Sequence, residues 1–412
     1  MTAWARSRYA DLEQGLSLTA GVQALALLII YASSFVDILG SISTGTISSQ
    51  GILTVAYFCG ALILLPAIPG SGGTLPWRLT PLLVFVFWVV VSLTWTTTII
   101  NGVQNAMVIT TFLLLLLVAD AAASADPRFV QWLSNQLGPS AILASVLYGA
   151  SVCWWGPGTS ELIGARSFGL FALLGVAHFL AEWRYGRWTG LLWATLITVL
   201  IGLSESRLAL GIAVALFPLS QIPTRRLTRV FRMAAVACGV IALSYAAFEY
   251  FDALRDRFLI GDTSVKFAGI GINVSGRLSF WRVTMESIND SPIVGKGAGS
   301  TEGLIESVFL DIRHPHNDYL RVVHDYGVIG VGLWIVAILT LLISLWRSWR
   351  RADREKSGLA RFHLAALLGL IAFILAMSME NALVYTFVTA PLALLIGSAF
   401  GSVRARRASC AR

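Results

Sequence analysis

Long apolar runs recur along almost the whole chain, and they limit what it can fold into. A helix needs about 20 apolar residues to cross the hydrocarbon of a bilayer. Because lipid offers no hydrogen-bond partners, only helices or closed barrels can span it. Hydrophobic residues make up 56% of the 412 residues, and the mean hydropathy is +0.75, far outside the range of a soluble domain. The runs are long enough for helices, so the sequence predicts an all-α polytopic membrane protein.

We expect about twelve transmembrane helices. Very short turns around Ser204 and at Glu380 and Asn381 predict two tight helical hairpins. The first run is too long for a signal-peptide core, so we keep it as a helix. The expected division is residues 1–250 with nine helices, 251–326 as one large loop, and 327–412 with three helices and a basic tail. The expected spans are 16–36, 49–68, 79–97, 103–123, 140–156, 168–183, 188–204, 207–222, 230–250, 327–346, 362–380 and 383–400.

The basic residues are distributed unevenly between the two sets of loops. With a cytoplasmic N-terminus, the inner segments hold 20 of the 30 lysines and arginines, and the short outer loops hold only Arg166 and Arg207. The other eight lie in the 251–326 segment. The positive-inside bias therefore predicts that both termini are cytoplasmic and that this segment faces out. The net charge of +8 is explained by topology, and we expect no nucleic-acid partner.

The outer segment predicts one amphipathic helix. Apolar residues recur three and four apart from Gly276 to about Asn289, after the candidate cap Ser275. This helix would lie against the membrane or the bundle, or it is an ordinary packed loop helix. Its Arg277 and Arg282 would add positive charge to a nearby site or bind anionic headgroups.

The sequence GKGAGS at 295–300 predicts a flexible turn. Its glycines do not have the spacing of a nucleotide-binding loop, and no strand precedes them. We therefore expect no nucleotide cofactor.

A polar loop with three of the five histidines, His314, His316 and His324, runs directly into an apolar segment. Asn317 or Asp318 suits a helix N-cap, so His316 would stand just before a helix start and exchange protons with solvent. An unperturbed imidazole has a pKa of about 6.5 and can act as a base near neutral pH. The alternative is a loop histidine that only hydrogen-bonds a neighbour.

A metal site is a second alternative for these histidines, with Asp311 or Asp325 as a further ligand. The His-x-His spacing suits a strand, however, and no strand pattern or cysteine accompanies it. We expect no metal.

Arg207 follows a short turn and opens an apolar run, so it lies near a helix N-terminus. The helix dipole disfavours a cation there, and a bound anion would resolve the conflict. Arg166 repeats the arrangement on the same face. Two arginines at two helix N-termini suit a phosphate or diphosphate. The alternatives are local pairing with Glu205 and Glu161, or contact with lipid headgroups.

The second half of the chain resembles the O-antigen ligase and polymerase superfamily of bacterial envelope glycosyltransferases. The motif is a histidine and an asparagine, nine further residues, and Gly-x-x-Gly. It is matched here by His316, Asn317 and the stretch from Gly327 to Gly330. The stretches GRLSFWRVTMESINDSPIVGKGAGS from Gly276 and SESRLALG from Ser204 are also similar to the family.

The resemblance implies a GT-C-like fold and a glycosyltransferase that uses an undecaprenyl-diphosphate-linked glycan on the periplasmic face of the inner membrane. It assigns His316 as the catalytic base and Arg207 and Arg166 as diphosphate ligands. Neither a metal nor a cofactor is implied. The acceptor is lipid A-core, a lipid-linked repeat or a protein hydroxyl. The candidate supporting residues are Arg277, Arg282, His314, Asn317 and Asp318.

Two other functional classes fit twelve spans. A transporter or lipid flippase would need coupling sites at mid-membrane depth, and most spans carry no charge there. A scaffolding membrane protein would leave the outward arginines and the histidine motif unexplained.

Overall fold

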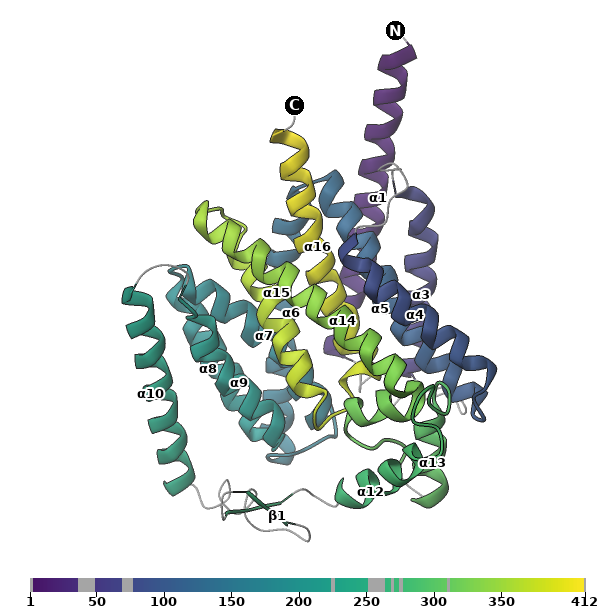
Figure 1. Ribbon diagram of the computed structural model, residues 1–412. Helices are drawn as coiled ribbons and strands as arrows, with labels where there is room; N and C mark the ends of the chain where they lie inside the picture. Colours follow the sequence, from purple (N-terminus) through teal and green to yellow (C-terminus); the bar gives the residue numbers. More distant parts are fainter. Residues whose placement is uncertain are drawn as a thin grey trace.

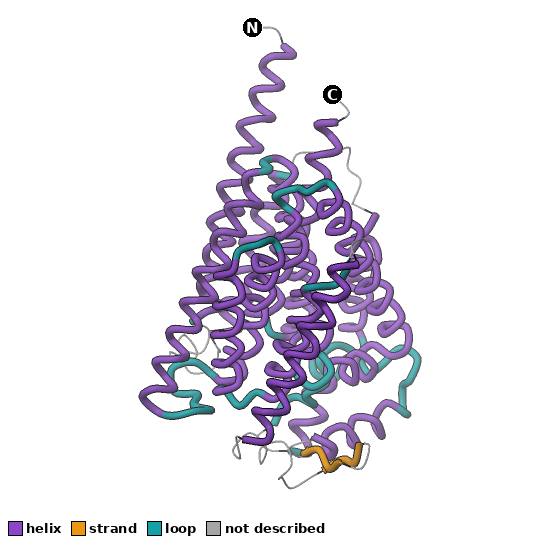
Figure 2. The backbone as a smooth tube through the Cα atoms, turned by 90° about the vertical axis from the view of Figure 1, so that its left-hand side faces the viewer, coloured by secondary structure: helices purple, strands orange, loops and turns teal. Residues whose placement is uncertain are grey.

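The computed structural model describes residues 3–35, 49–68, 77–223, 227–250, 264–267, 270–273, 277–309 and 312–410. These residues form a helical bundle with one small β-hairpin at its foot (Figures 1 and 2). Strand β1 (Ser264–Phe267) pairs antiparallel with β2 (Ile270–Asn273). The all-α class is confirmed in its essentials, and the hairpin is the one strand pair in the described part of the chain.

Each of the twelve expected spans falls on a helix, because long apolar runs in lipid have to satisfy their backbone internally. The helices of the bundle are α1 (Ala3–Ser34), α3 (Ser49–Leu64), α4 (Thr80–Val91), α5 (Ile99–Ala125), α6 (Arg128–Trp155), α7 (Ala165–Arg184), α8 (Trp188–Leu203), α9 (Arg207–Ser220), α10 (Leu227–Tyr250), α14 (Asp318–Arg354), α15 (Ala360–Ala376) and α16 (Thr386–Cys410). Short 3-10 turns η1 (Leu65–Ala67), η2 (Trp77–Leu79), η3 (Ser92–Thr94) and η4 (Ala382–Val384) adjoin them.

Six helical stretches of the described chain are long and apolar enough to cross a membrane, judged by length and composition, and five further apolar helices are shorter. This is a multi-pass membrane protein, and the count of twelve spans stays a prediction. The two expected hairpins are present. Three residues separate α8 from α9, and η4 with its flanking residues separates α15 from α16.

The centre of the bundle is formed by α5, α7, α15 and α16, whose residues are mostly buried. Gly397 and Gly401 of α16 lie against the backbone of α5 at Leu116 and Asp120, where a Cβ atom would collide with a carbonyl oxygen. Glycine therefore permits the close approach of these two helices. Helices α4, α6 and α14 expose more of their apolar surface, as lipid-facing helices do.

Both termini lie at one end of the bundle, and the hairpin with α12 (Arg277–Ile288) and α13 (Ser300–Val308) lies at the other (Figure 1). The expected amphipathic helix thus corresponds to α12, which buries Phe280 and Thr284. Its candidate cap Ser275 lies outside the described residues.

The Gly-x-x-Gly half of the sequence motif forms a kink in α14. Gly327 has φ +64°, and a Cβ atom there would collide with the backbone of Ile293 and Gly295. Backbone hydrogen bonds join the 292–300 loop to the kink in both directions. Gly297 N–H donates to the Asp325 carbonyl, and Val328 N–H donates to the Pro292 carbonyl, each over 2.9 Å. The GKGAGS segment is therefore an ordered loop, and the prediction of a flexible turn was wrong. Its glycines permit backbone-to-backbone packing.

Candidate active site

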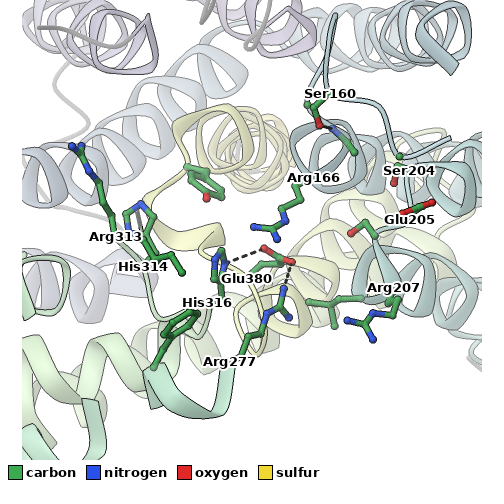
Figure 3. A pocket seen from close by; sticks show the side chains of 18 residues that line it. Ser160, Arg166, Ser204, Glu205, Arg207, Arg277, Arg313, His314, His316 and Glu380 are labelled. Atoms are coloured by element: carbon green, nitrogen blue, oxygen red, sulfur yellow. Dashed lines mark hydrogen bonds and ion pairs between the residues drawn. The ribbon is translucent and has the colours of Figure 1, made fainter. Parts of the chain in front are cut away.

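A pocket of about 830 Å³ opens at the end of the bundle opposite the termini. It is lined by the N-terminal ends of α7, α9 and α12, by the loop before α14 and by the loop between α15 and α16 (Figure 3). Five of the residues singled out from the sequence meet here: His316, His314, Arg207, Arg166 and Arg277. They come from four segments of the chain that are far apart in sequence.

Three helix N-termini converge on this pocket. Arg207 and Arg277 are the first residues of α9 and α12, and Arg166 is the second residue of α7. The N-caps of α7 and α9 make no side-chain capping bond, although the first amide of α7, at Ala165, donates to Ser160 Oγ over 3.3 Å. The dipoles of these helices add partial positive charge to that of the arginines. Four arginines and two glutamates line the pocket in all. The arrangement suits a strongly anionic group.

His316 has φ +51°, a left-handed backbone conformation that is uncommon for a residue with a side chain. Flanking bonds hold it there. The Trp281 indole on α12 donates to the Pro315 carbonyl over 2.9 Å, and Asn317 accepts from the Leu320 amide as the N-cap of α14. Glu205, on another wall of the pocket, has φ +55°. Strained backbone of this kind is concentrated at functional sites.

The His316 ring meets the loop between α15 and α16. Its Nδ1 lies 3.1 Å from the Asn381 amide nitrogen and 3.7 Å from Glu380 Oε2. Arg277 Nη2 donates to Glu380 Oε1 over 3.1 Å (Figure 3). Burial is the largest influence on the Glu380 carboxyl and favours its neutral form. The His316 imidazole and the guanidinium groups of Arg277 and Arg166 outweigh it and hold the pKa of Glu380 below its ordinary value.

His314 contacts a different set of groups. The fully buried Arg321 donates from Nη2 to His314 Nδ1 over 2.8 Å and from Nη1 to Glu302 Oε1 over 2.9 Å. Burial, followed by the charge of Arg321, lowers the pKa of His314 far below its ordinary value. The imidazole is therefore neutral near pH 7. Since an arginine can only donate, Nδ1 is the unprotonated nitrogen and Nε2 carries the proton.

Three candidate supporting residues lie outside the pocket lining. Asn317 caps α14, and Asp318 is buried, where its Oδ2 accepts from the Leu383 amide over 2.7 Å. Through these bonds both residues stabilise the loop that carries His316, without lining the pocket. Arg282 is largely exposed on α12 and pairs with Glu286 one turn away. Its position is that of a solvated surface charge.

His324 does not join the other two histidines. Its Nε2 lies 3.0 Å from Ser287 Oγ and its Nδ1 3.2 Å from Asp325 Oδ1, in a buried network that also receives Thr301. The three histidines of the alternative metal set are therefore split between two places. Asp311, its other candidate ligand, lies outside the described residues.

Sequence reasoning did not assign Glu380, Tyr385 and Arg321 to the site. Glu380 and Tyr385 line the pocket, and Arg321 sets the orientation of His314. The sequence does contain one indication of Glu380, which is a charged residue in the short polar break between two apolar runs. Arg321 follows His314 by seven residues, and the loop that precedes α14 brings the two side chains into contact.

Comparison with known proteins adds two findings. Residues 190–335 match the sequence model of a family described as O-antigen ligase. This stretch contains Arg207 and both pocket histidines, while Arg166 precedes it. A 112-residue stretch is 27% identical to exopolysaccharide production protein ExoQ of Rhizobium meliloti (strain 1021). That match covers 24% of this chain and 26% of the relative, so it spans only about a quarter of the relative's length.

Proposed function

We propose that the chain is a member of the O-antigen ligase and polymerase superfamily, which the match of residues 190–335 and the similarity to ExoQ support, and that it transfers a glycan from undecaprenyl diphosphate to an acceptor sugar hydroxyl. A membrane enzyme of the ligase or polymerase type needs a site for an anionic leaving group beside a base. The observation that carries the proposal is the single pocket in which His316 shares the lining with arginines at three helix N-termini.

Arg166 and Arg207 are the proposed ligands of the diphosphate. When the bond between the anomeric carbon and the diphosphate oxygen breaks, the electron pair leaves with the diphosphate and its negative charge grows. Guanidinium groups fixed in the pocket stabilise that charge more in the transition state than in the bound donor. Arg277 pairs with Glu380 over 3.1 Å, so we assign it no direct part in this step.

His316 is the proposed general base. Its Nε2 takes the proton of the acceptor hydroxyl while that oxygen forms its bond to the anomeric carbon. The donor supplies the driving force, so no nucleotide is consumed. Because arginines supply the charge neutralisation that metal ions supply in many phosphoryl transfers, we expect transfer to continue in excess EDTA.

The proposed location is the bacterial inner membrane, with both termini in the cytoplasm and the pocket on the periplasmic side. The support is the distribution of arginines in the sequence and the position of both termini opposite the pocket (Figure 1). The acceptor is lipid A-core in a ligase and a second lipid-linked repeat in a polymerase. A polymerase makes a ladder of products from the donor alone, which distinguishes the two.

The test is release of undecaprenyl diphosphate by purified protein in detergent, from a lipid-linked glycan pool supplied with lipid A-core as an added acceptor. We expect release by the wild type, and its loss in His316→Ala and Arg207→Ala. Donor binding should survive in His316→Ala and weaken in Arg207→Ala. Arg282→Ala is the matched control, because it removes an arginine of the same end of the molecule that lies outside the pocket. Unchanged turnover in His316→Ala would refute His316 as the base, and a wild type that releases no undecaprenyl diphosphate would favour the transporter alternative.

A further inference from the structure

Two consecutive residues of the loop between α15 and α16 enclose one side of the His316 ring. The residues Glu380 and Asn381 are 4% and 0% exposed, so neither is a loosely held surface group. Both lie within 4 Å of the same ring atom, Nδ1. The other ring nitrogen, Nε2, is left as the one that can reach a substrate in the pocket.

Glu380 is fixed in this position. Its Oε1 accepts from Arg277, whose side chain is only 15% exposed, and Arg166 extends toward it from α7 (Figure 3). A buried carboxylate without such partners would be costly. Burial is the largest single influence and raises the pKa of Glu380, but His316, Arg277 and Arg166 together hold it below its ordinary value, so the group is ionised at neutral pH. A fixed negative charge therefore stands beside the imidazole.

Two buried acceptor oxygens beside His316 indicate which ring nitrogen carries the proton. Glu380 Oε2 and Asn381 Oδ1 are buried acceptors with no hydrogen-bond partner among the described residues. Buried acceptors are rarely left in that state. A proton on His316 Nδ1 could serve both, after a half-turn of the Asn381 amide and a small tilt of the ring that shortens the 3.7 Å separation from Glu380. Nε2 then has a free lone pair.

We propose that Glu380 is the positioning residue for His316: it holds the ring with Nε2 toward the substrate and stabilises the positive imidazole formed when Nε2 takes the acceptor's proton. This inference rests on the proposed function. Glu380 lines the pocket, but its proposed role is indirect and acts through His316. Arg277 then serves mainly to hold Glu380 in place, and less as a ligand of the diphosphate.

The test is a double-mutant cycle on undecaprenyl diphosphate release with purified protein. Glu380→Gln keeps the shape and removes the charge. We expect kcat to fall by about 100-fold, as for a misplaced catalytic group, with KM for the donor changed less than about 2-fold. In a His316→Gln background the same change should cost less than about 2-fold, because the group through which Glu380 acts is already gone. Glu286→Gln, an exposed acid on α12, is the matched control.

Glu380→Asp covers the case in which Glu380→Gln does not fold. It keeps a charged partner for Arg277 but withdraws the carboxylate from His316, so it should lower kcat in the wild-type background alone. Equal losses in both backgrounds, or a raised KM at unchanged kcat, would mean that Glu380 acts on substrate directly and would overturn the proposal. Full activity of Glu380→Gln beside an inactive His316→Gln would overturn it too. An inactive wild type would instead refute the proposed function, and this role with it.

Discussion

His314 and His316 are two residues apart, line the same pocket and are surrounded by opposite chemistry. An arginine donates to Nδ1 of His314, whereas a carboxylate and an amide face Nδ1 of His316. The first environment leaves Nε2 protonated and the imidazole neutral. The second favours a proton on Nδ1 and a free lone pair on Nε2. These surroundings support different proposed tasks for two identical side chains, with His314 as a hydrogen-bond donor and His316 as a base.

This difference shows that the partner on the far side of a histidine decides its role in the pocket. His314 depends on α13 and α14 through Glu302 and Arg321, and His316 depends on the loop between α15 and α16. Neither set of partners is adjacent in sequence to its histidine. The comparison can be tested by changing each ring and each partner in turn.

The largest effect is expected from His316→Gln. The glutamine amide reaches about as far as Nε2 but cannot take a proton, so undecaprenyl diphosphate release should fall by roughly 10² to 10⁴-fold, the usual contribution of a general base. In His316→Ala, added imidazole should restore part of the rate, because the pocket of about 830 Å³ has room for it. His314→Ala should show no such rescue. Rescue of both variants, or of His314→Ala alone, would reverse the assignment.

Arg321→Leu should unfold the site that holds His314. Arg321 is 1% exposed and is the partner of the buried Glu302 and of Asp318. Removing one member of a buried ion pair costs about 3–5 kcal/mol, because the remaining charge is left without a partner. Thermal unfolding in detergent should show a large loss of stability. The double variant Arg321→Leu with Glu302→Leu should recover part of it, and an unchanged midpoint in the single variant would disprove a structural role for this pair.

His314→Asn should have a moderate effect. Asparagine keeps an acceptor near the position of Nδ1 for Arg321 and withdraws the Nε2–H donor from the pocket. Loss of one neutral hydrogen bond is worth about 0.5–1.5 kcal/mol, so we expect roughly a 2-fold to 10-fold fall in kcat/KM for the donor. Steady-state kinetics on folded, size-matched samples would measure it. A loss as large as that of His316→Gln would identify His314 as a second essential catalytic group.

Much of this architecture was predictable from sequence, for reasons that can be named. Apolar length places helices, because lipid leaves the backbone no other partner. Arg207 was correctly placed at a helix start, because the turn before it is short and polar. Asn317 was one of two residues expected to cap α14, and it does. These features depend on neighbours in the chain.

The partners of the two histidines were beyond the reach of sequence reasoning. Glu380 lies 64 residues after His316 and meets it only because α15 returns to the same end of the bundle. The sequence predicts a flexible turn at GKGAGS because glycine marks turns, whereas in the structure the glycines allow this loop to pack on the kink at Gly327. Glycine composition alone does not separate a mobile loop from a tightly packed one.

The smallest effect is expected from pH acting on His314. Its pKa is lowered in the folded protein, so below about pH 6.5, the ordinary value, the unfolded chain binds a proton that the folded chain does not. Stability therefore falls as the pH falls through that value and is retained above it. His314→Asn removes this proton, so its stability should fall less between pH 7.5 and pH 5.5 than that of the wild type. Thermal unfolding at the two pH values measures the difference, and parallel losses would show that His314 binds a proton in the folded protein, contrary to its lowered pKa.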